Sequence, residues 1–280
     1  MELYPMNINY RYYDLEYFFD KCRQENFKKV ELWLCPQHFL VNAQFTQDSK
    51  ILLDLMNKYE ISIDVICGEQ NNPKPNNIAA RNAFLIENTY NYFCRVIDLA
   101  CEVNASKILV TPGWNYYDES PDAARKRSIK MLKRICDYAK EKNIKVAMET
   151  IWSKSSLVAN TIEKAKEIFE GVNRDNFGFT IDFGAMHYAN ETIDDWYKAF
   201  PNNIWHVHFV DGDPTGHKPW GHGSLIMKDY IEAFIKHGYS GGLSMEYVDA
   251  MSFMNPEKYL KETKAIFNSC MQGKEGREND

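Results

Sequence analysis

Short apolar segments alternate with longer segments of helical periodicity along this 280-residue chain, and this alternation constrains its fold more than any other feature. The apolar segments are rich in Val, Ile and Leu, which is typical of parallel strands buried on both faces. We predict eight strands whose starts lie about 34 residues apart on average: 7–10, 29–33, 61–67, 107–111, 145–149, 177–182, 204–209 and 242–247.

Helical patterns fill the intervals between the predicted strands. Ser120 followed by Pro121 predicts the start of one long helix, because serine is a good N-cap and proline fits the first helical position. Gly171, Gly238 and Gly241-Gly242 are expected to mark returns from helix to strand. The predicted helices cover 14–26, 83–102, 120–142, 161–169, 193–200, 228–237 and 257–268.

Eight strands alternating with helices at similar spacing predict an α/β fold, namely a closed (β/α)₈ TIM barrel in a single domain. An open doubly wound sheet is the alternative, but no Gly-rich dinucleotide motif follows the first predicted strand. We expect the barrel to occupy residues 1–271. The polar, aperiodic residues 272–280 are expected to form a disordered tail.

Composition and charge narrow the classes of partner. The formal net charge of −6 argues against a protein that binds nucleic acid through the phosphate backbone. No apolar run reaches the ~20 residues that a membrane-spanning helix needs, and no signal peptide is visible. The seven cysteines are scattered and form no CxxC pair, which favours reduced thiols and a cytoplasmic location.

Ionisable residues stand near the ends of four successive predicted strands: Glu149, Asp182, His208 and Glu246. The carboxyl ends of barrel strands meet at one face, where such side chains would repel one another unless a cation held them. Three oxygen donors and one imidazole suit Mn²⁺ best, with Mg²⁺ or Co²⁺ as alternatives. Each residue taken alone can equally be a structural strand-end group.

His206 shares a face with His208 because the two are separated by one residue in a strand. His206 lies deeper, and two interpretations stay open for it. It can donate a hydrogen bond to a group beside the metal site, or it can be a packed core histidine.

At these residues the sequence resembles the xylose isomerase-like TIM barrel superfamily of sugar isomerases and epimerases, most closely the fructoselysine and ketose 3-epimerases. The resemblance spans nearly the whole chain. It is carried by Val30-Glu31-Leu32-Trp33, Met148-Glu149-Thr150, Thr180-Ile181-Asp182-Phe183-Gly184, His206-Val207-His208, Gly221-His222-Gly223 and Gly238-Tyr239 running into Glu246.

The resemblance implies a function and roles for individual residues. Glu149, Asp182, His208 and Glu246 would hold one divalent metal, and the two glutamates would also be the catalytic acid and base. The implied reaction is C3 epimerisation of a ketose or fructosamine-type sugar, by proton abstraction through a metal-bound enediolate. A homo-oligomer is also expected, because relatives often form one.

Residues on the loops at the same end of the barrel are candidates for binding substrate. Many relatives place a histidine two or three residues after the sixth-strand aspartate, whereas here those positions are Gly184 and Ala185 and the histidine is His187. The alternative for all of these residues is a structural role in the rim or a solvated loop. The candidates are His38, Glu69, Trp114, His187, His217 and Trp220.

Three other functions are alternatives to this one. The large subunit of a C-glycoside deglycosidase resembles the same group and would need a small partner subunit. An apurinic-site endonuclease would need an Asp-x-His pair late in the chain, but Asp229 is followed by Tyr230 and Ile231. A sugar-binding barrel without chemistry is the non-enzymatic alternative, although all four ligand candidates are present.

Overall fold

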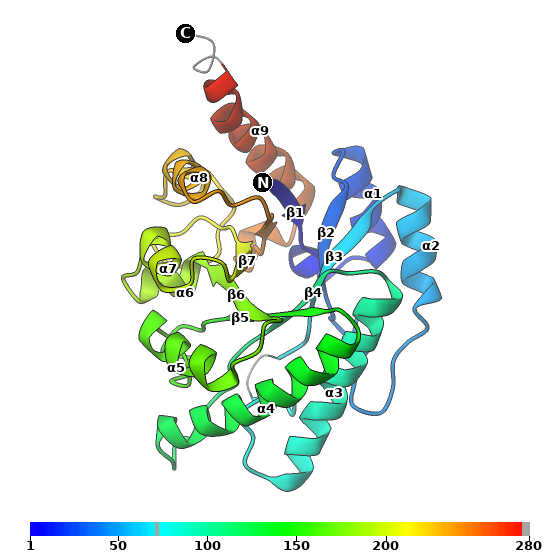
Figure 1. Ribbon diagram of the computed structural model, residues 1–280. Coiled ribbons are helices and arrows are strands. Elements are labelled where there is room, and N and C mark those ends of the chain that lie inside the picture. The colour runs from blue at the N-terminus through cyan, green and yellow to red at the C-terminus, as the bar shows by residue number, and fades with distance from the viewer. Residues whose placement is uncertain (71–72, 276–280) are drawn as a thin grey trace.

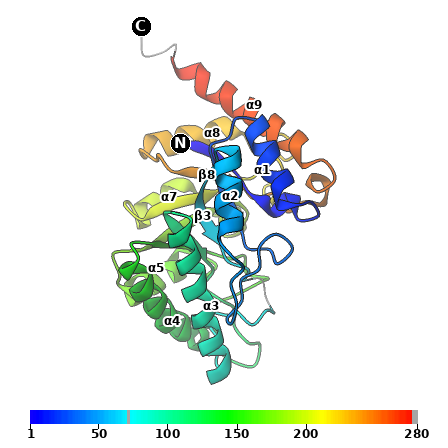
Figure 2. The same cartoon turned by 90° about the vertical axis from the view of Figure 1, so that its right-hand side faces the viewer.

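The computed structural model describes residues 1–70 and 73–275 and contains one eight-stranded parallel sheet rolled into a barrel, with helices outside it (Figures 1 and 2). Neighbouring strands follow chain order from β2 to β8, and β1 pairs with β8. The strands are β1 (Glu2–Pro5), β2 (Lys29–Trp33), β3 (Ser62–Cys67), β4 (Lys107–Val110), β5 (Lys145–Glu149), β6 (Phe177–Asp182), β7 (Ile204–His208) and β8 (Gly242–Met245). This architecture confirms the predicted single-domain TIM barrel.

The helices cover the outer face of the sheet. They are α1 (Leu15–Gln24), α2 (Lys50–Tyr59), α3 (Ala83–Glu102), α4 (Pro121–Glu141), α5 (Ile162–Val172), α6 (Phe183–Tyr188), α7 (Ile193–Ala199), α8 (Met227–Lys236) and α9 (Pro256–Glu275), with 3-10 turns η1 (Asn7–Tyr10) and η2 (Ala250–Ser252). The sequence patterns did not predict α2 or α6. Ser120 caps α4 as expected, its side chain accepting a hydrogen bond from the backbone of Ala123.

The prediction of a strand at residues 7–10 is wrong. The first strand is β1, and residues 7–10 form η1. The amide of Asn7 accepts a hydrogen bond from the backbone N–H of Trp33 and donates one to its carbonyl oxygen, at 2.7 and 2.9 Å. A side chain thus supplies the pairing that a longer strand would have made with β2. A parallel bridge between Met6 and Glu31 completes the junction.

Asparagines, more than glycines, turn the chain out of its helices. Asn26, Asn104, Asn143 and Asn173 follow helix ends with φ between 46° and 58°, a left-handed conformation that asparagine tolerates well. Gly171, which was predicted to mark such a return, lies inside α5. Gly238 has a φ of 69° and turns the chain after α8, as predicted.

Helix α9 continues through the start of the predicted tail. It projects from the barrel and ends at Glu275, so residues 272–275 are helical, and residues 276–280 lie outside the described residues (Figures 1 and 2). No described helix combines the length and hydropathy needed to cross a bilayer. Each of the seven cysteines is a free thiol.

The core lies in two places. The larger part fills the space between sheet and helices, where Phe179 packs against Phe169, Trp196 and Phe200. A smaller apolar cluster inside the barrel includes Tyr4, Met6, Val65, Cys67 and Leu109. The rest of the barrel interior contains buried polar groups. Because a buried polar group is costly unless it has a partner, these groups mark where a functional site is expected.

Candidate metal centre

Four side chains from four consecutive strands meet at the carboxyl end of the barrel. Glu149 ends β5, Asp182 ends β6, His208 ends β7, and Glu246 follows β8. Each offers one ligand atom, and these atoms all lie within 4.8 Å of one another. Asp182 and His208 are directly paired in the register of β6 and β7, which brings their side chains to the same height. The structure therefore gathers all four sequence-predicted ligand candidates around one point.

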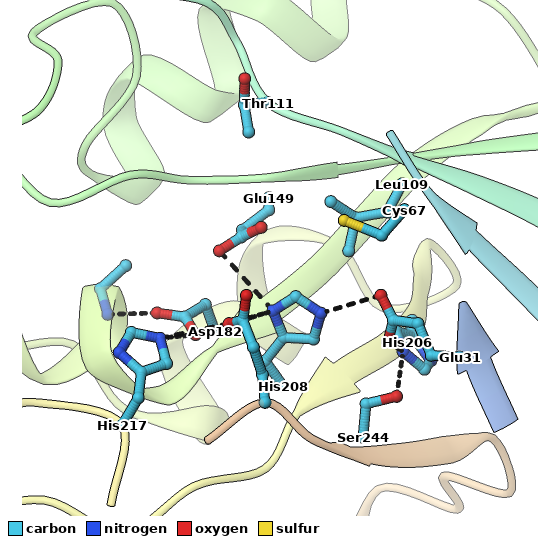
Figure 3. A network of polar contacts seen from close by, with 12 residues as sticks. Glu31, Cys67, Leu109, Thr111, Glu149, Asp182, His206, His208, His217 and Ser244 are labelled. Atoms are coloured by element: carbon cyan, nitrogen blue, oxygen red, sulfur yellow. Dashed lines mark hydrogen bonds and ion pairs between the residues drawn. The ribbon is translucent and has the colours of Figure 1, made fainter. Parts of the chain in front are cut away.

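His208 links this point to the barrel interior. Its Nδ1 atom faces the carboxylates, at 2.9 Å from Glu246, 3.7 Å from Glu149 and 3.9 Å from Asp182. This nitrogen is buried and has no partner in hydrogen-bonding geometry. Its Nε2 atom lies 3.2 Å from Glu31 on the opposite side of the ring (Figure 3). A neutral His208 that donates from Nε2 to Glu31 would present its Nδ1 lone pair to a cation held by the three carboxylates.

Glu31 contacts both histidines of β7, and the sequence pattern had assigned it no role in the site. It lies in the middle of β2, fully buried, and its carboxylate accepts from Nε2 of His206 at 2.7 Å (Figure 3). His206 Nε2 also contacts the hydroxyl of Ser244 at 2.9 Å. His206 is therefore hydrogen-bonded to Glu31, which itself contacts the candidate ligand His208, an arrangement that favours the first of the two interpretations. The signal in the sequence was a carboxylate between the apolar residues Val30 and Leu32 of this strand.

The negative charge of the carboxylates in this cluster is balanced chiefly by His208. Burial alone would raise the pKa of Glu31, but His208 and His206 lower it well below its usual value. Burial lowers the pKa of His206. Burial also opposes the charged form of His208, yet the carboxylates of Glu246 and Glu31 raise its pKa well above the usual value. In the metal-free protein, a protonated His208 thus stands in for the positive charge that the carboxylates require.

The pKa values of Glu149 and Glu246, at the carboxyl end of the barrel, are shifted in opposite directions. Burial raises the pKa of Glu149 to about 7, against the lowering effect of His208. Burial would also raise the pKa of Glu246, but His208 and His217 lower it to about 2. Near neutral pH, one carboxyl group is ionised while its neighbour retains a proton for part of the time. A pair whose proton affinities differ in this way is suited to acid–base chemistry.

His217 comes to the centre on the loop after β7. Its Nε2 atom lies 2.9 Å from Asp182 and 3.3 Å from Glu246 (Figure 3). Gly184 makes room for this ring, because a Cβ there would come within 2.8 Å of the His217 ring. The loop is held by Asp211, which is fully buried and accepts four backbone N–H groups, from Gly212, Gly221, Gly223 and Leu225.

An open cavity of about 640 Å³ lies at the carboxyl end of the barrel, and its wall includes Glu149, Asp182, His217 and Glu246. That volume is within the range of roughly 300–1,000 Å³ that is usual for small-molecule sites. Glu69 and His217, two predicted substrate contacts, line the cavity, and Glu69 pairs there with Lys74 at 3.0 Å. Trp152 and Tyr188 also line it, and their rings pack edge to face at 4.8 Å.

Four other predicted substrate contacts are not brought to this cavity. Trp220 is buried, donates from Nε1 to the carbonyl of Phe209 and packs on the ring of that residue. His38 is buried beside η1 and hydrogen-bonds to Asn7 and to the carbonyl oxygens of Tyr10 and Tyr13. Their surroundings are those of structural side chains.

His187 and Trp114 are likewise absent from the lining. His187 lies on α6 and contacts the hydroxyl of Tyr230 at 3.0 Å. It follows Ala185 by two positions, which is about 200° around a helix, so it does not share the face on which Ala185 and Tyr188 line the cavity. Gly184 and Ala185, the positions at which the resemblance implied a histidine, line the cavity instead. The ring of Trp114 packs against Tyr116.

Comparison with protein families gives a match over most of the chain. The sequence model described as xylose isomerase-like TIM barrel matches residues 19–270. An uncharacterised protein of Methanocaldococcus jannaschii is 25% identical over 267 residues, covering 91% of this chain and 87% of that protein. Fructoselysine 3-epimerase of Shigella flexneri is 20% identical over 259 residues, covering 92% and 93%.

Solved structures share the fold across the whole chain. An L-ribulose 3-epimerase superposes with a TM-score of 0.81 at 16% identity, covering 98% of this chain and 95% of that one. An IOLI protein with a bound zinc atom superposes with a TM-score of 0.78 at 17% identity, covering 96% and 98%. At these identities the likeness establishes the common architecture.

Proposed function

The chain belongs to the xylose isomerase-like TIM barrel family, and on that premise we propose that it is a divalent-metal-dependent sugar epimerase that inverts C3 of a ketose or fructosamine. The observation that carries the proposal is the convergence of three carboxylates on the buried Nδ1 of His208. Fructoselysine 3-epimerase is similar over 92% of this chain, which supports the same class of reaction.

The donor set fits a divalent cation. Three carboxylates and one imidazole, with no thiolate among them, suit a hard or borderline ion, so we propose Mn²⁺ as the native metal, with Mg²⁺ or Co²⁺ as substitutes. Glu149, Asp182, His208 and Glu246 would hold it, and Glu31 would fix the His208 ring from behind. Such an ion would stabilise the negative charge that develops on the substrate oxygens as a proton leaves carbon.

The chain's own residues supply the proton transfers. Epimerisation next to a carbonyl removes a proton from one face of the carbon and returns one to the other face. Glu149 and Glu246 both line the cavity and differ in proton affinity, so one is suited to remove a proton and the other to donate one. Trp152 and Tyr188 offer aromatic surface to a sugar and exclude water from the reacting carbon.

Exchange of the C3 proton tests the proposal directly. The metal-depleted protein is reconstituted with Mn²⁺, Mg²⁺ or Co²⁺ and incubated in D₂O with a panel of ketoses and fructosamines, and deuterium at C3 is followed by NMR. We expect exchange and inversion that depend on the metal. Either Glu149→Gln or Glu246→Gln should slow inversion by about 10²–10⁴-fold.

Glu167→Gln serves as the control variant, because Glu167 is a surface glutamate on α5 that pairs with Arg125. It should retain the wild-type rate. The proposal is overturned if no substrate exchanges its C3 proton with any of the three metals, or if both glutamine variants keep full activity.

A further inference from the structure

A guanidinium group without an acidic partner lies on the wall of the cavity. Arg11 follows η1 and lines the same cavity as Glu149, Asp182 and Glu246. In residues 1–70 and 73–275, it forms no ion pair with a carboxylate; its contacts are with a backbone carbonyl and two aromatic rings.

Arg11 is held by one backbone hydrogen bond and two aromatic rings, and not by a carboxylate. Its Nε–H donates to the carbonyl oxygen of Ile8 at 2.9 Å. The guanidinium carbon lies 4.4 Å from the ring centre of Phe253 and 5.4 Å from that of Trp33. Contact with aromatic rings restrains the position of a guanidinium while leaving its N–H groups free for acceptors in its own plane. The two terminal nitrogens of Arg11 are thus positioned in advance for a ligand.

The other cations of the cavity are already neutralised by the protein. Lys74 pairs with Glu69, and His217 lies between Asp182 and Glu246. Six further arginines of the described chain pair with carboxylates: Arg23, Arg81, Arg125, Arg127, Arg134 and Arg174. Arg95 has no such ion pair either, but it lies on α3, donates to the carbonyl of Ala43 and is not part of the lining.

We propose that the substrate carries an anionic group, a carboxylate or a phosphate ester, away from the reacting carbon and that Arg11 binds this group. The inference rests on the proposed function for the reacting end of the substrate. A neutral sugar offers Arg11 only hydroxyl acceptors, so the charge of the guanidinium would be partly desolvated without being compensated. A carboxylate or phosphate accepts two parallel hydrogen bonds from one guanidinium, the strongest pairing available to this side chain.

The test compares matched pairs of substrates that differ only in the anionic group. One pair is N-fructosyl glycine and N-fructosyl methylamine, which lacks the carboxylate. The other is fructose 6-phosphate and fructose. The quantity measured is the ratio of kcat/KM for C3 proton exchange, anionic member over neutral member. We expect a ratio of roughly 10 to 150 in one of the pairs, and that pair identifies the anion.

Arg11→Met should reduce this ratio to near one, chiefly through a higher KM for the anionic member. Arg11→Lys, which keeps the charge without the paired donors, should give an intermediate ratio. Arg95→Met is the matched control, and it should keep the wild-type ratio. Circular dichroism confirms that each variant is folded.

Two results would overturn the assignment while leaving the proposed function intact. One is a wild-type ratio near one in both pairs, and the other is an Arg11→Met ratio equal to that of wild type. If no compound exchanges its proton, the proposed function fails. Binding of fructose 6-phosphate and N-fructosyl glycine by calorimetry then decides the role of Arg11, since equal affinity for wild type and Arg11→Met would refute it.

Discussion

Replacing Glu149 by Gln should stabilise the metal-free protein at about pH 7.5. Burial raises the pKa of Glu149 from its usual 4.5 to about 7, against the opposing effect of His208. Because the folded state holds this proton more tightly than the unfolded state, the free energy of unfolding falls as pH rises from about 4.5 to about 7. The difference in pKa corresponds to about 3 kcal/mol of lost stability above pH 7, which Gln would restore.

Glu246→Gln is the matched comparison and should have the opposite effect. Burial alone would raise the pKa of Glu246, but His208 and His217 lower it to about 2. Its ionised form therefore contributes stability that is present above about pH 4.5 and is lost as pH falls towards about 2. Removing the charge should lower the free energy of unfolding by at most about 3 kcal/mol at about pH 7.5.

Thermal unfolding followed by circular dichroism, in the presence of a chelator, measures both effects. For a chain of 280 residues, 3 kcal/mol corresponds to about 5 °C in Tm. We expect Tm to rise for Glu149→Gln and fall for Glu246→Gln at about pH 7.5, and the gain of Glu149→Gln should vanish at about pH 4.5. If both variants shift Tm in the same direction, the electrostatic reasoning about this site is wrong.

Three further outcomes are expected. Glu31→Gln should weaken metal binding about 10- to 100-fold by calorimetry, because glutamine is uncharged and has one acceptor oxygen in place of the two that face His206 and His208, whereas Glu167→Gln should bind metal like wild type. Metal binding should release a proton and strengthen as pH rises, because the metal displaces the proton of His208. Burial opposes that proton, but Glu246 and Glu31 raise the pKa of His208. Calorimetry in buffers of different ionisation enthalpy counts the released protons, and a count of zero would contradict this expectation. Asp211→Ala should lower the free energy of unfolding by about 3 kcal/mol or more in denaturant titrations, because four backbone N–H groups lose their acceptor, while Asp213→Ala, on the exposed side of the same loop, should change it by less than about 1 kcal/mol.

The periodicity of apolar residues was enough to predict the barrel and to group the four candidate ligands. The apolar runs and their even spacing are local properties of the chain, and they predicted seven of the eight strands close to where they lie. Glu149, Asp182, His208 and Glu246 could be grouped in advance because the carboxyl ends of parallel barrel strands meet at one face. No knowledge of side-chain packing was needed for that step.

Tertiary structure alone decided what surrounds these residues. Glu31 and His206 are 175 positions apart and lie on strands that are not neighbours, so their contact depends on how the closed barrel directs side chains across its interior. Arg11 reaches the cavity only because Asn7 replaces strand pairing and η1 turns the chain there. Trp220 and His38, both plausible from sequence as sugar contacts, are buried by loop packing. Periodicity reports which face of an element is apolar, whereas loop conformation and barrel closure set which polar groups meet.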